Sequence, residues 1–280
     1  MELTKKRELQ RFARQLRIDA LNEVHDAHSG HIGGSLSICD TLAYLYKRVL
    51  RIDPAHPHDP GRDRFVLSKG HASPALYAVL AEMGFFPREE LKSFRRIGCM
   101  LQGHPDMKKI PGVDMTSGSL GQGVSAAVGM AVAGKITGAD YRVFAMLGDG
   151  ELQEGQVWEA AMLAAHRGLD NLTAIVDNNG LQIDGPVDKV NSPYPITDKF
   201  AAFGWDVTTA DAHDFDSLEA AFRRAAEVRG KPCVIVQKSV KGKGVSFMEN
   251  QASWHGTPPS DEQYAAALAE LTAGMEKEGM

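Results

Sequence analysis

Residues 142–179 read RVFAMLGDGELQEGQVWEAAMLAAHRGLDNLTAIVDNN, and this stretch decides the fold. It contains two short apolar runs, at 142–147 and 172–176, and each is followed by a turn rich in Gly, Asp or Asn. Between the runs, residues 157–167 place apolar side chains at helical spacing. A buried strand, a helix and a second buried strand in this order predict a right-handed βαβ unit in a parallel sheet.

The same alternation continues on both sides of this unit. Upstream, residues 64–67 are an apolar run that leads through a turn into a helical stretch ending near residue 83. Downstream, residues 218–229 predict a helix and residues 233–237 a buried strand. Further helices are expected at 9–24, 37–50, 124–133 and 261–271, and a loop at 53–62. We therefore expect one doubly wound α/β domain with a mostly parallel sheet over residues 1–280, with an N-terminal helix and a C-terminal tail.

The composition excludes several classes of protein. Lys and Arg number 31 against 36 Asp and Glu, so the net charge of −5 provides no basic field for a nucleic acid. The first 17 residues contain no apolar signal core, and no run of 18 apolar residues occurs. Three widely spaced cysteines predict reduced thiols. We expect a cytoplasmic protein that binds neither nucleic acid nor a membrane.

Polar motifs follow both strands of the central unit. Gly148-Asp149-Gly150 follows the first strand, and Asp177-Asn178-Asn179 follows the second. Because ligands bind at the carboxyl ends of parallel strands, Asp149 and Asn179 can face one crevice. Carboxylate and amide oxygens suit Mg²⁺ or Ca²⁺, and flanking glycines let a phosphate approach the backbone. Each motif alone is typical of an ordinary turn. Together, on either side of one βαβ unit, they favour a metal and phosphate site.

This pair of motifs resembles the thiamine diphosphate signature, and the rest of the chain resembles the transketolase family in particular. The resemblance runs from about residue 10 to residue 258 and follows the family's order of motifs. The segments that carry it are SGHIGG at 29–34, DRFVLSKGH at 63–71, GHPD at 103–106, PGV at 111–113, TSGSLGQG at 116–123 and GDGELQEG at 148–155.

The resemblance implies twelve site residues. Asp149, Asn179 and the backbone carbonyl of Leu181 would bind the metal, which is Mg²⁺, with Ca²⁺ or Mn²⁺ as alternatives. The remaining nine would serve the cofactor and the substrate. Thiamine diphosphate would contact Gly148, Gly150, His71, His255, Gly118 and Leu120, whereas His31 and His104 would face the ketose donor and Glu154 would lie at the interface between cofactor sites.

Four of these residues are histidines that adjoin glycines: His31, His71, His104 and His255. Turns of this kind present the ring to a cleft, where imidazole can donate to phosphate or sugar oxygens and move protons near neutral pH. Any one of them alone is typical of a structural histidine, but four in the family's order favour one shared site. The other six lack this context and are expected to be structural or solvated: His25, His28, His56, His58, His166 and His213.

Two glycine-rich segments need separate interpretation. Residues 121–126, GQGVSA, match G-x-G-x-x-A, but no buried strand precedes them. A helix of small residues packed on the sheet is therefore favoured over a dinucleotide site. Lys238, Lys241 and Lys243 alternate with glycines but lack the spacing of a P-loop. For this segment a solvated basic loop and a role at the cofactor site or an interface both stay open.

The resemblance also implies the function. A full-length transketolase is more than twice as long as these 280 residues, so we expect the N-terminal subunit of a split transketolase. With a C-terminal subunit carrying the pyrimidine-binding domain, as an α₂β₂ assembly, it would transfer a two-carbon ketol unit from a ketose phosphate to an aldose phosphate. The chain departs from the family at Ile32, where a proline is usual, and at 98–102, where an arginine is missing.

Three alternatives stay open: a transketolase acting on an unusual ketose, a deoxyxylulose-phosphate synthase that uses pyruvate, and a non-catalytic scaffold subunit. The GHP motif followed by PGV favours ketol transfer over the pyruvate reaction. Intact Asp149, Asn179, His71 and His104 argue against a scaffold that has lost its activity.

Overall fold

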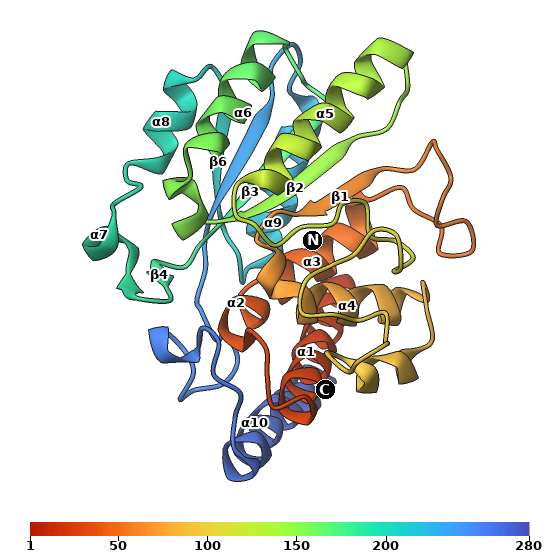
Figure 1. The fold of residues 1–280 in the computed structure, drawn as a ribbon, viewed down its shortest axis with the longest axis vertical. Coiled ribbons are helices and arrows are strands. Elements are labelled where there is room, and N and C mark those ends of the chain that lie inside the picture. Colours follow the sequence, from red (N-terminus) through yellow and green to blue (C-terminus); the bar gives the residue numbers. More distant parts are fainter. Residues whose placement is uncertain (280) are drawn as a thin grey trace.

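The computed structural model describes residues 1–279, and the side chains of residues 1–275. Its centre is a parallel five-stranded sheet with the strand order β1-β2-β3-β7-β6 (Figure 1). The strands are β1 (Arg64–Leu67), β2 (Val143–Gly148), β3 (Leu172–Asn178), β6 (Asp206–Asp211) and β7 (Cys233–Lys238). The predicted α/β fold with a mostly parallel sheet is confirmed.

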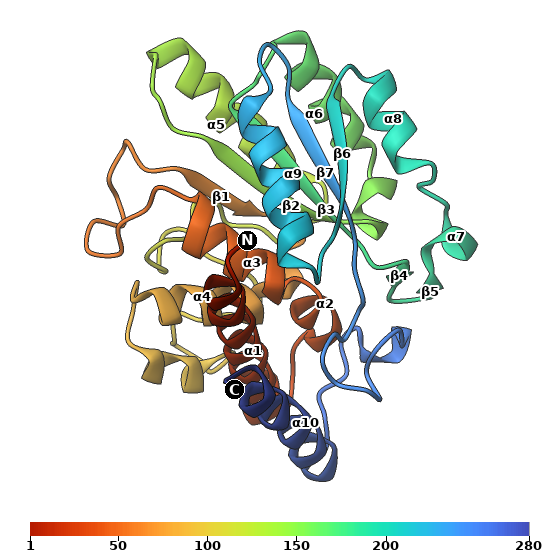
Figure 2. The same cartoon turned by 180° about the vertical axis from the view of Figure 1, so that it is seen from behind.

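Helices cover both faces of the sheet. On one face lie α5 (Gln122–Thr137), α6 (Gly155–His166) and α8 (Ile196–Ala202) (Figure 1). The opposite face is covered by α3 (Cys39–Tyr44) and α9 (Phe215–Glu227), and Figure 2 shows α9 crossing it. Beyond this layer, α1 (Leu3–Asp26) packs against α4 (Ser73–Met83) and α10 (Asp261–Gly279). The result is a sheet enclosed between two helical layers, as expected of a doubly wound fold.

The sheet divides the apolar interior into two cores, because successive side chains of a strand point to opposite faces. In β2, Val143, Ala145 and Leu147 belong to the core under α5, α6 and α8. The intervening Phe144 and Met146 belong to the core under α1, α3, α4 and α9. The central strands are therefore apolar over most of their length, which is why they appear in the sequence as apolar runs.

The start of α5 approaches the sheet closely. Gly121 precedes the helix with a φ of 81°, a left-handed conformation that favours glycine. A Cβ atom on Gly123 would lie 2.6 Å from the Cα of Ser68, so only glycine permits this contact. The helix thereby begins beside the carboxyl end of β1. This confirms the predicted helix of small residues packed on the sheet.

Short elements complete the described chain. They are α2 (Ile32–Leu36), α7 (Val187–Val190), a π-helical turn (Leu45–Val49), 3₁₀ turns (Gly70–Ala72, Arg88–Ser93, Gly150–Gln153 and Ala252–Trp254) and the β4 (Leu181–Gln182) and β5 (Gly185–Pro186) ladder. In the part of the chain that the structure describes, no helix combines the length and apolar character needed to cross a membrane. All three cysteines are free thiols.

Several elements differ from the prediction. The edge strand β6 and the helix α8 were not predicted. The helix expected at 37–50 is α-helical only to Tyr44 and continues as the π-helical turn. The short helix α2, which begins at Ile32, was not predicted. The second strand of the central unit continues through Asp177 and Asn178, which were expected in the following turn.

Candidate active site

A cavity of about 430 Å³ opens at the carboxyl ends of β1, β2 and β3. Segments far apart in the sequence form its walls, from the loop before α2 to the turn after Ala252–Trp254. All twelve predicted site residues line it: His31, His71, His104, Gly118, Leu120, Gly148, Asp149, Gly150, Glu154, Asn179, Leu181 and His255. The structure thus brings together every predicted position, while their individual roles remain predictions.

The four histidines form a cluster around His31. The centre of its ring lies 5.2 Å from that of His71, 5.3 Å from that of His255 and 6.5 Å from that of His104. Burial is the main cause that lowers the pKa of all four, to about 4 for His31 and about 3 for His255. Contrary to the expectation of rings near their ordinary pKa, they are neutral hydrogen-bonding groups at physiological pH.

Asp149 lies at the end of β2 with 2% of its surface exposed. Its carboxylate accepts hydrogen bonds from the backbone N–H groups of Gly150, at 2.8 Å, and Gly180. Burial, followed by the nearby charge of Asp177, raises the pKa of Asp149 to about 6. A positive charge at this position would therefore stabilise the ionised carboxylate.

Asp149, Asn179 and Leu181 together present a carboxylate, an amide and a backbone carbonyl to the same cavity. Within the described residues no group of three or more His, Cys, Asp or Glu side chains is arranged for a metal, so a metal here would depend on amide and carbonyl oxygens. This corner attracts cations, because the Leu181 carbonyl accepts a hydrogen bond from the ammonium of Lys241 at 3.3 Å. Hard oxygen donors of this kind fit Mg²⁺.

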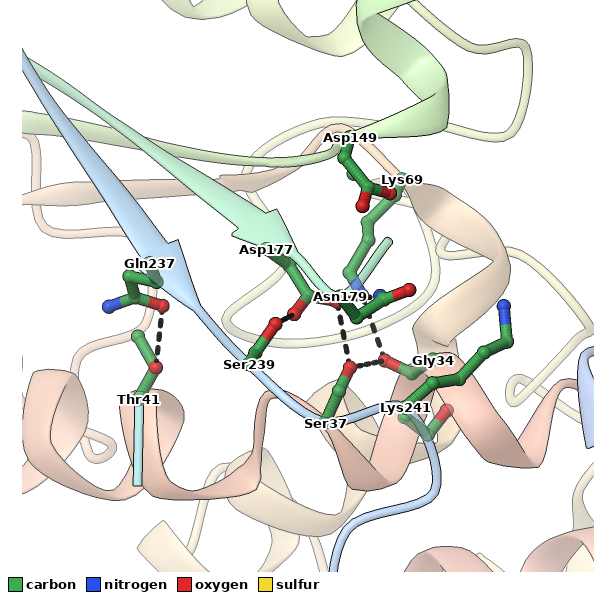
Figure 3. A network of polar contacts seen from close by, with 12 residues as sticks. Gly34, Ser37, Thr41, Lys69, Asp149, Asp177, Asn179, Gln237, Ser239 and Lys241 are labelled. Atoms are coloured by element: carbon green, nitrogen blue, oxygen red, sulfur yellow. Dashed lines mark hydrogen bonds and ion pairs between the residues drawn. The ribbon is translucent and has the colours of Figure 1, made fainter. Parts of the chain in front are cut away.

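Asp177 is the centre of a buried polar network (Figure 3). One of its oxygens accepts from Lys69 Nζ at 2.6 Å, Ser37 Oγ at 2.7 Å and Asn179 Nδ2 at 3.0 Å, and the other accepts from Ser239 Oγ. Burial alone would raise the pKa of Asp177, but the charge of Lys69 and these hydrogen bonds lower it below its ordinary value. The network fixes the side chain of Asn179 at the edge of the cavity.

Two buried lysines line the cavity. Lys69 was not predicted as a site residue, and for the segment that contains Lys241 a role at the site was one of two open interpretations. Lys69 pairs with Asp177 and also donates to the carbonyl of Gly34 at 2.8 Å. Lys241 donates to Leu181, and its Nζ lies 2.7 Å from His255 Nδ1. Burial lowers the pKa of Lys241 to about 8. Of the two interpretations left open for the basic segment, the buried Lys241 supports a role at the site, whereas Lys238 is exposed.

The two glutamates after β2 have different surroundings. Glu151 is buried, and its carboxylate accepts from Ser68 Oγ and from the backbone N–H groups of Gly121 and Gly148. It therefore joins the start of α5 to the end of β2 and supports the cavity wall. Glu154 is exposed and also lines the cavity. This placement leaves its carboxylate accessible, as the predicted interface role requires.

Comparisons with known proteins place these features in a family. Residues 8–278 match the model of the family described as transketolase, thiamine diphosphate binding domain. The chain is 48% identical over 272 residues to the 6-deoxy-6-sulfo-D-fructose transketolase subunit SqwG of Clostridium sp. (strain MSTE9), covering 97% of this chain and 98% of that one. It is 42% identical over 254 residues to one subunit of the apulose-4-phosphate transketolase of Phocaeicola vulgatus, covering 91% of this chain and 90% of that one.

Solved structures of transketolases are similar to this fold. Transketolase from Leishmania mexicana superimposes with a TM-score of 0.89 at 30% identity over 97% of this chain, and transketolase from Campylobacter jejuni with a TM-score of 0.89 at 33% identity over 96%. The chain spans 45% of the length of each of these two proteins. The family match, the two relatives and these structures together show that the chain belongs to the transketolase family and corresponds to its thiamine diphosphate-binding domain.

Proposed function

We propose that this chain is the N-terminal subunit of a two-chain transketolase that transfers a two-carbon ketol unit from a ketose to an aldose with thiamine diphosphate and Mg²⁺. The observation that carries the proposal is the single cavity in which a hard-oxygen metal corner, two buried lysines and four neutral histidines lie together. This combination suits a diphosphate at one end and sugar hydroxyl groups at the other.

The residues divide by chemistry into two ends of the cavity. Asp149, Asn179 and the Leu181 carbonyl would hold the metal, and Lys69 and Lys241 would balance the charge of the diphosphate. When bound, thiamine diphosphate supplies the nucleophilic carbon and the electron sink for breaking the bond beside the ketose carbonyl. His31 and His104, as neutral rings, would donate to and accept from the hydroxyl groups of the donor sugar and orient its carbonyl.

A partner chain is part of this proposal. The relatives from Clostridium and Phocaeicola are both named as subunits, and they are similar to this chain over nearly their whole length. Ile183 lines the cavity yet is 65% exposed. An apolar group beside an open cavity favours a protein surface that covers it. The expected occupant is a C-terminal subunit with the pyrimidine-binding domain, in an α₂β₂ assembly with a cofactor at each interface between chains.

The donor sugar is the finer part of the proposal. A ketose phosphate remains the general expectation, with an aldose phosphate as acceptor. The names of the Clostridium and Phocaeicola relatives favour the alternative of an unusual ketose, either one that carries a sulfonate or apulose 4-phosphate. All of these sugars share the hydroxyketone end that His31 and His104 would contact, so the choice between them depends on the other end of the sugar.

The test is reconstitution. The purified chain and its partner subunit should transfer ketol units only together, with thiamine diphosphate and Mg²⁺, and should be assayed with ordinary ketose phosphates, 6-deoxy-6-sulfo-D-fructose and apulose 4-phosphate. In the complex, His104→Ala should lower turnover about ten- to a thousandfold with cofactor affinity nearly unchanged. Full ketol transfer by the 280-residue chain alone would contradict the two-chain proposal. Wild-type kinetics in the His104 variant would show that this ring is only structural.

A further inference from the structure

Arg95 is a strained residue beside the histidine cluster. Its backbone φ is 59°, a left-handed conformation that a non-glycine residue keeps only where its surroundings enforce it. Its backbone N–H donates to the carbonyl of Leu101 at 2.8 Å. The strain therefore belongs to the loop that leads to His104.

The guanidinium of Arg95 contacts the loops of two histidines. Nη1 donates to the hydroxyl of Ser29, which lies two residues before His31, at 3.0 Å. A Cβ atom on Gly103 would lie 2.7 Å from Cζ of Arg95, so the guanidinium lies directly against the backbone beside His104. These two loops are more than 70 residues apart in the sequence, and Arg95 contacts both.

We propose that Arg95 is a positioning residue for the donor end of the cavity: its guanidinium ties the loop that carries His31 to the loop that carries His104. Two rings that orient one sugar must keep a fixed separation, and small errors of position slow catalysis strongly. The tie would hold the two ring centres at their separation of 6.5 Å. The catalytic part of this inference rests on the proposed ketol transfer.

The charge of Arg95 acts on the same rings. No carboxylate in the described part of the chain forms an ion pair with Arg95, and its Nε is buried without a hydrogen-bond partner there. After burial, Arg95 is the largest cause that lowers the pKa of His31 and of His104. The other groups that face His31 are Lys241 and the rings of His71, His104 and His255. Arg95 therefore helps keep both rings neutral as well as in place.

Four variants separate these effects. Arg95→Gln removes the charge and the several N–H donors of the guanidinium. Arg95→Lys keeps the charge but replaces the planar guanidinium with an ammonium group. Gly103→Ala leaves Arg95 intact but places a methyl group against the guanidinium and should displace it. Arg96→Gln is the matched control, because Arg96 is the next residue in the chain and its side chain is exposed.

The first measurement needs no substrate. Isotope-labelled histidine in the full chain is titrated by NMR, with His56 as an internal reference. We expect the pKa of His31 and of His104 to rise in Arg95→Gln and to stay near the wild-type value in Arg95→Lys and Arg96→Gln. Unchanged histidine titrations and ring signals in both Arg95→Gln and Gly103→Ala would overturn the proposal, even if the proposed function is correct.

The second measurement uses the reconstituted complex with a ketose donor. Arg95→Gln should lower kcat/KM about ten- to a hundredfold with cofactor affinity within about threefold of wild type, and Arg95→Lys should recover part of the loss. Gly103→Ala should act through Arg95, so the double variant with Arg95→Gln should be no worse than Arg95→Gln alone. A wild-type kcat/KM in Arg95→Gln would contradict the proposal that Arg95 ties the two loops. So would a double variant whose loss equals the sum of the losses of Arg95→Gln and Gly103→Ala. If the complex transfers no ketol unit to any acceptor, the proposed function fails, and the NMR result alone decides the tie.

Discussion

Asp177 and Glu23 are two buried carboxylates with opposite surroundings. Each is 1% exposed. Asp177 accepts hydrogen bonds from four side chains, one of them the ammonium of Lys69. Neither oxygen of Glu23, on α1, has a partner among the described residues. The pKa of Asp177 is below its ordinary value, whereas burial, followed by the charge of Asp19, raises that of Glu23 well above it.

The difference shows that hydrogen-bond partners, and not burial alone, decide the state of a buried acid. Asp177 is ionised, and its network orients Asn179 and Lys69 towards the cavity. The raised pKa of Glu23 favours its protonated form, because burial and the charge of Asp19 both disfavour the carboxylate. Glu23 lines a separate cavity together with Asp19 and Arg88. The polar network around Asp177 therefore holds side chains in place at the candidate site. The buried, unpartnered carboxyl of Glu23, by contrast, lowers the stability of the fold.

The largest effect on stability is expected from Asp177→Asn, which removes the charge of the hydrogen-bonded carboxylate in this comparison. It leaves the Lys69 ammonium buried without a counter-charge, and the free energy of unfolding should fall by about 3–5 kcal/mol. Denaturant unfolding measures this. The paired change Lys69→Met with Asp177→Leu should recover part of the loss, because it removes both charges. A loss under about 1 kcal/mol in Asp177→Asn would show that the ion pair is not important for stability.

Asp149→Ala tests a third buried carboxylate, which is proposed to bind the metal. Removing a charged oxygen ligand should weaken thiamine diphosphate and Mg²⁺ binding in the complex by at least about tenfold, while the cofactor-free chain keeps its stability within about 1 kcal/mol. Calorimetry gives the affinity. Asp188→Ala is the control, since Asp188 lies on α7 with an exposed side chain. Unchanged affinity in Asp149→Ala would remove Asp149 from the metal site.

Ser37→Ala weakens the Asp177 network without removing a charge. The Ser37 hydroxyl donates to Asp177 at 2.7 Å, and its loss should lower the free energy of unfolding by about 1–3 kcal/mol, as for other hydrogen bonds to a charged group. The comparison variant is Ser93→Ala, which removes an exposed hydroxyl bonded to the Glu90 carbonyl. Equal effects of the two substitutions in urea unfolding would mean that the Asp177 network is not special.

Glu23→Gln should have the smallest effect, with the opposite sign. Because burial raises the pKa of Glu23, the folded chain binds this proton more tightly than the unfolded chain, which releases it above the ordinary pKa of 4.5. Wild-type stability should therefore decline relative to Glu23→Gln as the pH rises above about 4.5. At pH 8 the variant should be equal to wild type or up to about 1 kcal/mol more stable. Urea unfolding at pH 5 and pH 8 measures the difference, and a variant clearly less stable at pH 8 would indicate an ionised, stabilising Glu23.

The sequence predicted the elements that are buried on both sides and missed those that are not. The runs at 142–147 and 172–176 contain strands because nearly all of their residues belong to one of the two cores, Arg142 and Thr173 being the exceptions. The edge strand β6, Asp206–Asp211, reads DVTTAD and buries only Ala210 fully, so it has no apolar run to reveal it. The helix α8 is too short for a clear helical period.

The site shows the same limit. The twelve residues of the family motifs were placed in one cavity by order and spacing. Lys69 was not, and for Lys241 the site role was only one of two open interpretations, because a lysine in a glycine-rich segment is usually solvated. Their burial depends on distant partners: Lys69 pairs with Asp177, 108 residues away, and Lys241 donates to Leu181, 60 residues away. Such pairings follow from the fold and cannot be obtained from local patterns.

The division of the interior into two cores has a consequence for how this chain can change during evolution. Substitutions of Ala145 and Leu147 alter the core under α5 and α6, whereas a substitution of Met146 alters the core under α3 and α9. Changes in one core should show epistasis with one another, since they share neighbours, but combine independently with changes in the other. Adjacent positions of β2 can therefore be substituted independently of each other during evolution. Positions that co-vary within this strand should be two residues apart.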